Sequence, residues 1–346
     1  MPRFHLFMLL AVCAGCLLPF FPDTAHAEIG LRDALKARLI KKMADKAVPD
    51  SESDVSVPIT TSGDYTFTIT YDDISRAYLV HVPPSYNPAR PMPLLFAFHG
   101  GGGDMNYQAD DTKYGLISKS DKEGFIVVFP NGVGAFSSTG KLATWNAGIC
   151  CGKARDENID DVGFVRTIVT NITRQMNVDR SKIFATGMSN GGMMVQRLAC
   201  EMADVFAGIA SVTGTDSTTY CRPSRPIPVL HIHALNDDHV LFNGGAGKDA
   251  FRDPSKVADF ISVPETIKRW VGRNHCAPTP VRVLSNEGAY CDLYSNCAGG
   301  VHVKLCVTET GGHSWPGGVK TRGNEPTSKA ISANDQMWNF FMGRVQ

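Results

Sequence analysis

Residues 183–199 read IFATGMSNGGMMVQRLA. Residues 183–187 form a short apolar run that predicts a buried strand, and the apolar residues after the glycines recur with helical spacing. Between the two lies the Gly-x-Ser-x-Gly pattern of Gly187, Ser189 and Gly191. The order strand, Gly-x-Ser-x-Gly, helix is typical of a nucleophile elbow, where glycines two residues from the serine leave room for a sharp turn. The stretch therefore predicts a reactive serine, Ser189, exposed at the start of a helix.

Two further residues are expected to activate this serine. A serine hydroxyl becomes a good nucleophile when a base takes its proton and a carboxylate orients that base. In this arrangement the acid and then the histidine follow the serine along the chain. His313 is the candidate base because it lies late in a glycine-flanked loop, TGGHSWPGG. Asp237 is the candidate acid because it follows the predicted strand 229–233, at the sheet edge where α/β proteins gather their sites. Asp238 is the alternative acid.

A second glycine cluster points to the same chemistry. The apolar residues 94–99 predict a strand that leads into four consecutive glycines, 100–103. The N–H groups of Gly101 and Gly102, together with that of Asn190, are expected to form an oxyanion hole for a tetrahedral intermediate. A phosphate-binding loop is the rival interpretation of a glycine run, but no Gly-Lys-Ser/Thr follows here.

A metal site is the rival interpretation of the region around Asp237. His231 and His233 lie on one face of a predicted strand, and Asp237, Asp238 and His239 follow. Their spacing departs by two residues from the His-x-His-x-Asp-His pattern of metallohydrolases, and a core position is the ordinary role of a histidine inside a strand. We therefore predict no metal and no organic cofactor.

The rest of the chain predicts one α/β domain over residues 60–346, with a mostly parallel central sheet and helices on both faces. Short apolar runs alternate with segments of helical periodicity, as in parallel-sheet proteins. The predicted strands are 65–70, 77–82, 94–99, 125–129, 183–187, 208–212, 229–233 and 302–307. The predicted helices are 107–122, 160–177, 190–202, 263–274 and 332–343. Asp160 and Asp161 open one of these helices and are interpreted as capping residues.

The N-terminal segment predicts export. Residues 1–27 contain Arg3, an apolar run and then Ala25-His26-Ala27, which has the small-x-small form of a signal-peptidase site. The run is short for a membrane span, so we expect a removed signal peptide, no stable membrane insertion and a periplasmic or extracellular protein. Residues 28–59 predict a basic amphipathic helix and a linker. The helix could touch a membrane or a partner, or it could pack on its own domain.

Charge and cysteine content exclude some classes of protein. The 34 basic and 34 acidic residues leave no excess charge for nucleic acid, and 43% hydrophobic with 20% charged residues excludes a disordered chain. Of ten cysteines, Cys13 and Cys16 lie in the predicted signal peptide, which leaves eight for disulfides in an exported protein. The pairing is open, but the adjacent Cys150 and Cys151 are expected to bond to different partners. The four cysteines between 276 and 306 predict a stapled segment.

These motifs together resemble a known family, the secreted esterases that include polyhydroxybutyrate depolymerase-like enzymes and bacterial feruloyl and acetyl xylan esterases (carbohydrate esterase family one). The matching segments are YLVHVP at 78–83, HGGGG at 99–103, WNAGICCG at 145–152, DDVGF at 160–164, the Ser189 elbow, 233–240 and 311–318. The resemblance implies the α/β-hydrolase fold and carboxylic ester hydrolysis through an acyl-serine, with Ser189, Asp237 and His313 as the triad. The sequence departs from the family at 234–236, where a small residue and glycine are usual.

The resemblance also implies a substrate class. Segment 145–152 is expected near the mouth of the active site, so Trp145 and Trp315 are candidates for stacking on an aromatic acyl group, although Trp145 could instead pack in the interior. Feruloyl-type hydrolysis of plant cell-wall or xylan esters is favoured, because no polymer-binding module or Ser/Thr-rich linker is visible. Hydrolysis of poly(3-hydroxybutyrate) or hydroxyalkanoate oligomers is the alternative. A non-catalytic binding protein on the same scaffold would be expected to lose Ser189 or His313. The oligomeric state is left open.

Overall fold

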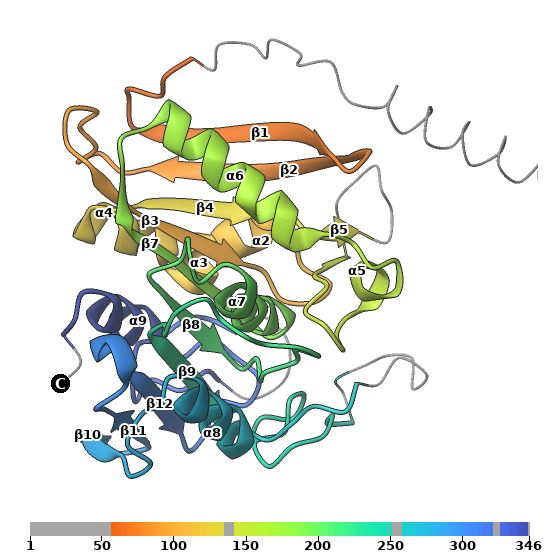
Figure 1. The fold of residues 1–346 in the computed structure, drawn as a ribbon, viewed down its shortest axis with the longest axis vertical. Coiled ribbons are helices and arrows are strands. Elements are labelled where there is room, and N and C mark those ends of the chain that lie inside the picture. Colours follow the sequence, from red (N-terminus) through yellow and green to blue (C-terminus); the bar gives the residue numbers. More distant parts are fainter. Residues whose placement is uncertain (1–56, 135–141, 249, 251–257, 321–325, 345–346) are drawn as a thin grey trace, which may run out of the picture. The chain divides into compact units, whose positions relative to one another are not determined.

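The computed structural model describes residues 57–134, 142–248, 250, 258–320 and 326–344 (Figure 1). The predicted signal peptide, 1–27, and the predicted basic helix after it lie outside these residues. Among the helices of the described part, none is long and apolar enough to cross a membrane.

A ten-stranded sheet forms the centre of the domain, in the order β1-β2-β4-β3-β7-β8-β9-β12-β11-β10 (Figure 1). The six strands from β4 to β12 in this order run parallel. A pair of antiparallel strands flanks them on each side. The strands are β1 (Gly63–Tyr71), β2 (Ile74–Val82), β3 (Met92–Phe98), β4 (Ile126–Pro130), β7 (Val178–Met188), β8 (Gly208–Val212), β9 (Val229–Ala234), β10 (Val281–Asn286), β11 (Ala289–Tyr294) and β12 (Val303–Thr308). The predicted mostly parallel sheet is confirmed.

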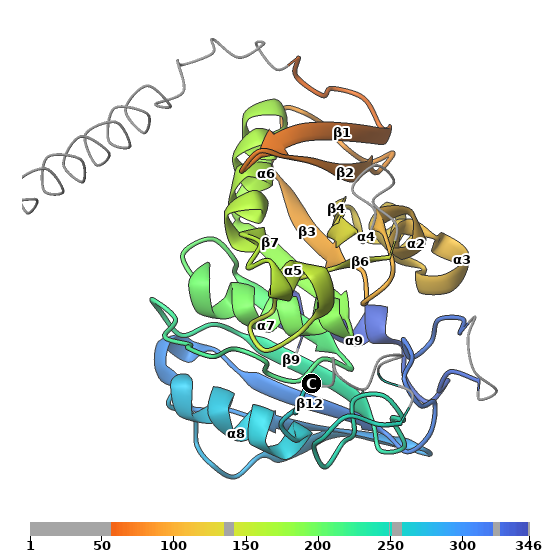
Figure 2. The ribbon, with the colours of Figure 1, turned by 90° about the vertical axis from the view of Figure 1, so that its right-hand side faces the viewer.

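Helices cover both faces of the sheet, as predicted (Figure 2). Successive residues of a strand point to opposite faces, so Phe96 of β3 packs in one apolar cluster and Leu95 in the other. Side chains of α6, α7 and α8 pack in the first cluster, and side chains of α4 and α9 pack in the second. The helices are α2 (Met105–Ala109), α3 (Asp111–Tyr114), α4 (Leu116–Glu123), α5 (Gly152–Asp156), α6 (Asp161–Gln175), α7 (Asn190–Glu201), α8 (Val263–Arg273) and α9 (Ala333–Phe341).

Three local features differ from the sequence-based expectation. The predicted helix 107–122 is three short helices, because Asp110 caps α3 and Gly115 adopts a left-handed conformation before α4. The hairpin of β10 and β11 was not predicted, because β10 is an edge strand without buried residues and a register shift between Arg282 and Leu284 interrupts its alternation of apolar residues. The short strands β5 (Val133–Gly134) and β6 (Ala143–Thr144) pair in a separate sheet.

The eight cysteines after residue 27 form four disulfides. Cys150 and Cys151 bond to each other, so the expectation that they bond to different partners is wrong. The other six cysteines are paired among themselves. Two bridges staple residues 276–306, as predicted, and one of these joins facing positions of β11 and β12. The pairs are Cys150–Cys151, Cys200–Cys221, Cys276–Cys297 and Cys291–Cys306.

The two aspartates before α6 have different roles. Asp160 caps the helix as predicted, since its carboxylate accepts a hydrogen bond from the Gly163 N–H at 2.9 Å. Asp161 is instead buried, so its expected capping role is wrong. Its carboxylate pairs with the Arg76 guanidinium at 2.7 Å and accepts from the Asn146 N–H at 2.8 Å. Asp161 therefore ties the start of α6 to β2 and to the loop that precedes α5.

Candidate active site

Ser189 occupies the sharp turn between β7 and α7. Its backbone has φ 56° and ψ −122°, which is a strained conformation for a residue with a side chain. Its N–H donates to the Val212 carbonyl at 2.8 Å, and its own carbonyl accepts from the Met193 N–H at 2.8 Å. The backbone of the turn is therefore held by the neighbouring strand and by the helix, and the serine is only partly buried.

The glycines around Ser189 are required by close backbone approach. A Cβ atom on Gly187 would lie 2.5 Å from the Gly191 carbonyl oxygen, and one on Gly191 would lie 2.3 Å from the Phe98 carbonyl oxygen. Real Cβ atoms do not come this close to backbone atoms, which cannot move aside as a flexible side chain can. The turn thus packs against the end of β3, where the second glycine cluster begins.

Gly191→Ala is expected to lower the free energy of unfolding by about 1–3 kcal/mol, since the added methyl overpacks backbone. Gly272→Ala is the matched control. Gly272 lies in α8, where an added methyl group would meet no atom of a neighbouring segment within 4 Å, so alanine there should stabilise the protein by about 0.5–1 kcal/mol. Urea unfolding of both variants measures the difference. A stable Gly191→Ala would show that the turn is looser than described.

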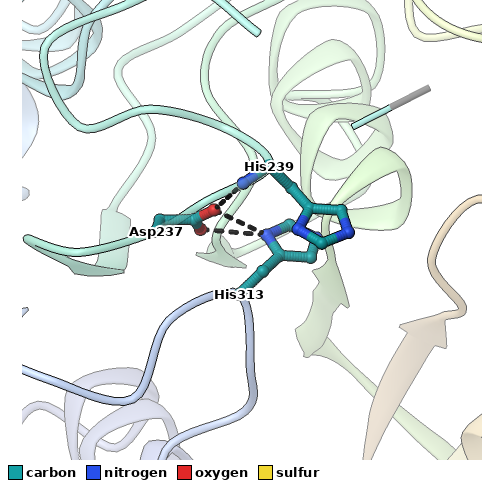
Figure 3. A group of neighbouring side chains, drawn as sticks. All are labelled: Asp237, His239 and His313. Carbon is teal, nitrogen blue, oxygen red and sulfur yellow. Dashed lines mark hydrogen bonds and ion pairs between the residues drawn. The ribbon is translucent and has the colours of Figure 1, made fainter. Parts of the chain in front are cut away.

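Asp237 and His313 come together at the same edge of the sheet (Figure 3). The two carboxylate oxygens of Asp237 lie 3.1 and 2.9 Å from Nδ1 of His313. The carboxylate also accepts from the N–H groups of His239 and Val240, each at 2.9 Å. Asp237 is 3% exposed. The side chain of Asp238 is 51% exposed and pairs with the His239 ring instead, so the structure favours Asp237 over the alternative acid.

Electrostatics keep Asp237 ionised. Burial alone would favour its neutral form, but the electrostatic and hydrogen-bonding interactions with His313 and His233 outweigh burial and hold the pKa of its carboxyl well below the usual range. An ionised carboxylate can only accept, so Nδ1 of His313 carries the proton that it donates to Asp237. Nε2 is then the basic nitrogen of a neutral His313 ring.

The sheet register places Ser189 near this pair. Ser189 follows β7, Asp237 follows β9 and His313 follows β12, and these parallel strands end at the same edge. Strands β7 and β9 are two positions apart, which corresponds to about 10 Å and leaves room for an imidazole between them. Among the described residues, neither the Ser189 hydroxyl nor Nε2 of His313 has a hydrogen-bond partner, so both are available to a substrate or to each other.

The glycine loop 100–103 lies against Ser189, but one of its predicted donors is already engaged. A Cβ on Gly101 would lie 3.6 Å from Cβ of Asn190, which brings these two residues side by side. The N–H of Gly102, however, donates to the Ala143 carbonyl at 2.8 Å. The oxyanion role of Gly102 is therefore wrong, because the loop pairs with a segment distant in sequence. The N–H groups of Gly101 and Asn190 bond to no other described residue.

His99 holds the glycine loop 100–103 through a hydrogen bond to its first residue. Its Nε2 accepts from the Gly132 N–H at 3.0 Å, so Nδ1 carries the proton and donates to the Gly100 carbonyl at 2.8 Å. Burial lowers the pKa of His99 to about 4, and the ring is neutral at physiological pH. Sequence reasoning placed His99 only in a matching segment and did not assign it this role.

The stacking roles expected for the two tryptophans are also wrong. Trp145 is fully buried against Phe98, and its indole N–H donates to the His99 carbonyl at 3.0 Å. Trp315 is buried as well, and its N–H donates to Asn334 at 3.0 Å. Neither ring presents a face to a ligand. The backbone of Trp145 does reach the site, because its N–H and carbonyl bond to the Asn190 side chain at 2.7 and 3.0 Å.

His239 lies at the site, although sequence reasoning named it only in the rival metal interpretation. Its ring stacks on that of His313, with centroids 4.6 Å apart and planes 12° from parallel (Figure 3). Asp237, His239 and His313 each offer one metal-ligand atom within 4.8 Å of the others. In this group Asp237 and His313 already bond to each other. Two of its members, Asp237 and His239, belong to the region considered for a metal. The two strand histidines of that region are engaged elsewhere, since Nε2 of His231 bonds to His233 and Nε2 of His233 bonds to the Val240 carbonyl.

Comparison with known proteins finds esterases among those similar to this chain. The family model described as esterase PHB depolymerase matches residues 76–220. A probable feruloyl esterase C of Aspergillus niger is 30% identical over 77% of this chain and 84% of its own length. The putative esterase NocK of Nocardia uniformis subsp. tsuyamanensis is 30% identical over 78% of this chain and 80% of its own length. Feruloyl esterase B of Piromyces equi is 31% identical over 69% of this chain, which spans 42% of that protein.

A solved structure supports the same conclusion at the level of the fold. The acetyl xylan esterase from Aspergillus awamori superposes with a TM-score of 0.56 at 14% identity, covering 80% of this chain and 99% of that one. The resemblance seen in the sequence, the α/β-hydrolase fold and the esterase class are confirmed. The chain belongs to the PHB depolymerase family of esterases.

Proposed function

We propose that the protein hydrolyses carboxylic esters through an acyl-enzyme intermediate on Ser189, with His313 as the base and Asp237 as the residue that orients it. The observation that carries the proposal is the contact of a buried, ionised Asp237 with Nδ1 of His313. This contact lies at the sheet edge where a strained turn presents Ser189. Such a carboxylate, imidazole and serine in this chain order are the components of a serine-hydrolase triad.

The reaction follows from these positions. Nε2 of His313 takes the hydroxyl proton as Oγ of Ser189 attacks the ester carbonyl carbon. The N–H groups of Gly101 and Asn190 donate to the oxyanion of the tetrahedral intermediate. The intermediate collapses, the C–O bond to the alcohol breaks, and His313 gives its proton to the departing oxygen. A water molecule then attacks the acyl-serine in the same way, releasing the carboxylic acid and restoring Ser189.

Asp237 contributes to each of these steps through the imidazole. While Nε2 holds the proton, His313 is positively charged, and the nearby carboxylate stabilises that charge. The hydrogen bond to Nδ1 also keeps the neutral ring in the tautomer whose Nε2 can accept. Neutral His99 holds the carbonyl of Gly100, so the loop that carries Gly101 is fixed without adding a charge beside the oxyanion.

The proposed substrates are feruloyl-type esters of plant cell walls. The support comes from relatives named feruloyl esterase, which match most of the chain. The buried tryptophans remove the aromatic stacking argument. Esters of 3-hydroxybutyrate are the second candidate, supported by the description of the matching family model.

Methyl ferulate is expected to be hydrolysed with a higher kcat/KM than a 3-hydroxybutyrate trimer ester. Initial rates of the purified protein on both substrates, each with Ser189→Ala as the blank, measure the preference. Subtracting the rate of this blank corrects for background hydrolysis and for any contaminating esterase. Faster cleavage of the trimer would assign the protein to hydroxyalkanoate esters, and turnover of neither substrate would remove both candidates.

We also propose export and a division of the chain into a signal peptide at 1–27, a helix and linker at 28–59, and a catalytic domain at 60–346. The small-x-small site before Glu28 supports the cleavage position. The four disulfides support an oxidising compartment. N-terminal sequencing of the exported protein is expected to start at Glu28, and a start at Met1 would contradict removal of the segment.

A further inference from the structure

A line of fully buried polar side chains leads from the interior of the domain to Asp237. Trp270 of α8 donates its indole N–H to Oε1 of Gln196 of α7. Nε2 of Gln196 lies 3.5 Å from Nδ1 of His231, and Nε2 of His231 lies 3.0 Å from Nδ1 of His233. All four side chains are 0% exposed. The line therefore joins two helices to the strand β9.

The last member of the line contacts the carboxylate. Nε2 of His233 lies 2.7 Å from the Val240 carbonyl oxygen and 3.3 Å from Oδ2 of Asp237. The titratable groups that face Asp237 are His233 from β9 and His239 and His313 from the two loops. Among the described ring nitrogens that lie within 3.3 Å of this carboxylate, that of His233 alone belongs to the sheet. His233 therefore places the carboxylate next to the central strand β9.

The hydrogen-bond partners determine where each proton lies. The Val240 carbonyl can only accept, so Nε2 of His233 carries a proton and Nδ1 does not. Nδ1 of His233 must then accept from Nε2 of His231, whose own Nδ1 accepts from the Gln196 amide. The indole N–H of Trp270 donates to Oε1 of Gln196, which leaves the amide nitrogen of Gln196 facing the His231 ring. One arrangement of protons satisfies the whole line. Its last donor, the Nε2–H of His233, donates to the Val240 carbonyl at 2.7 Å and lies 3.3 Å from Oδ2 of Asp237.

We infer that His233, supported by His231, is a positioning residue that holds the Asp237 carboxylate in the orientation that His313 requires. The inference rests on the proposed function. Both histidines are buried and neither faces Ser189 or the oxyanion donors, so they act through Asp237 rather than on the substrate. Burial lowers the pKa of His231 well below its usual value, so that ring stays neutral. His233 acts on the carboxylate in two ways, because its Nε2 lies 3.3 Å from Oδ2 of Asp237 and also bonds to the Val240 carbonyl, while the Val240 N–H donates to Oδ1 of Asp237.

The alternative is that the two histidines are ordinary core residues, whose hydrogen bonds are satisfied and which do not influence the active site. The two interpretations differ in their consequence for His313. With the His233 donor removed, the carboxylate would be less stabilised and its negative charge would act more strongly on His313. The acid limb of the pH profile of kcat/KM, which reports protonation of the essential base of the free enzyme, would then move to higher pH. If His233 were only a core residue, its replacement would lower the folded fraction equally at all pH values and would leave the acid limb in place.

The test compares His233→Phe, which removes the donor, with His233→Gln, which keeps an N–H. His81→Gln is the control, because His81 also bonds to two carboxylates but lies on β2, five strands from β9. Rates are expressed per active site, counted with a fluorophosphonate. We expect His233→Phe to lower kcat about tenfold, the effect of one hydrogen bond to a charged group, with KM unchanged and the acid limb at higher pH. In His233→Gln and His81→Gln the acid limb should lie at the same pH as in the parent protein.

Two results would overturn the inference. One is a parent-like kcat and acid limb per active site in His233→Phe. The other is an equal loss in His233→Phe and His233→Gln, which would show that the N–H donor is not the cause. If His233→Phe does not fold, His231→Phe serves instead, and it should move the limb in the same direction by a smaller amount, while no movement would overturn the inference. Parent-like activity of Ser189→Ala would instead contradict the proposed function.

Discussion

Ser189→Ala is expected to lower kcat for ester hydrolysis by about a millionfold, the loss found when a triad nucleophile is removed. Alanine keeps the backbone of the turn but supplies no oxygen to carry the acyl group. The oxyanion donors and the binding surface remain, so a small residual rate above that in water should persist. Initial rates of purified parent and variant on the same ester, over a wide range of enzyme concentration, measure the loss.

Ser181→Ala is the matched control for this variant. Ser181 lies on the same strand as the turn, at its other end, and its exposed hydroxyl bonds to Asp179. Its replacement should leave kcat unchanged. A Ser189→Ala protein that keeps more than about a hundredth of the parent rate would contradict the acyl-serine mechanism, since loss of a nucleophile costs far more than that.

Asp237→Asn is expected to lower kcat by about ten-thousandfold with little change in the fold. The amide occupies the same space, but its NH₂ group can donate to Nδ1 of His313. The ring would then carry its proton on Nε2, the atom that must accept the proton of Ser189. The loss should appear in kcat at neutral pH, measured on the ester that the parent hydrolyses fastest.

Asp238→Asn provides the comparison within the same loop. The Asp238 carboxylate is half exposed and bonds to the ring of His239, so its replacement should change kcat by less than about threefold, as expected of a surface ion pair. Equal losses in the two variants would point to a general effect of the loop. A large loss in Asp238→Asn with an active Asp237→Asn would reverse the assignment of the acid.

The parts of the fold that carry strong local signals could be predicted from the sequence. Strands β3 and β4 are short and wholly apolar because both of their faces are covered, and the Ser189 turn needs glycines at fixed positions. The edge strand β10 carries no such signal, because none of its residues is fully buried and a register shift between Arg282 and Leu284 interrupts its alternation of apolar residues.

The candidate site divides in the same way. Ser189, Asp237 and His313 could be named because each follows a recognisable strand in a fixed chain order. The engagement of the Gly102 N–H depends on Ala143, about forty residues away, and no local pattern reveals such a pairing. The burial of Trp145 depends likewise on the packing of Phe98 and Asn190 around it.

The roles of the other histidines are also long-range properties. A histidine within an apolar strand is typical of a core residue, and only the contacts of His231 with Gln196 and of His233 with Asp237 show that the two form a directed line. The stacking of His239 on His313 joins two loops that lie far apart in the sequence. Such contacts become visible when the strands are brought together.

The most direct test of the account is to identify the residue that forms the covalent intermediate. The purified protein is treated with a fluorophosphonate, which reacts with an activated serine and mimics the tetrahedral intermediate, and the modified peptide is located by mass spectrometry. The account predicts one adduct, on Ser189, that forms as ester hydrolysis is lost and that is absent from Ser189→Ala. Loss of activity with an adduct on another residue, or full hydrolysis by a protein labelled on Ser189, would contradict it.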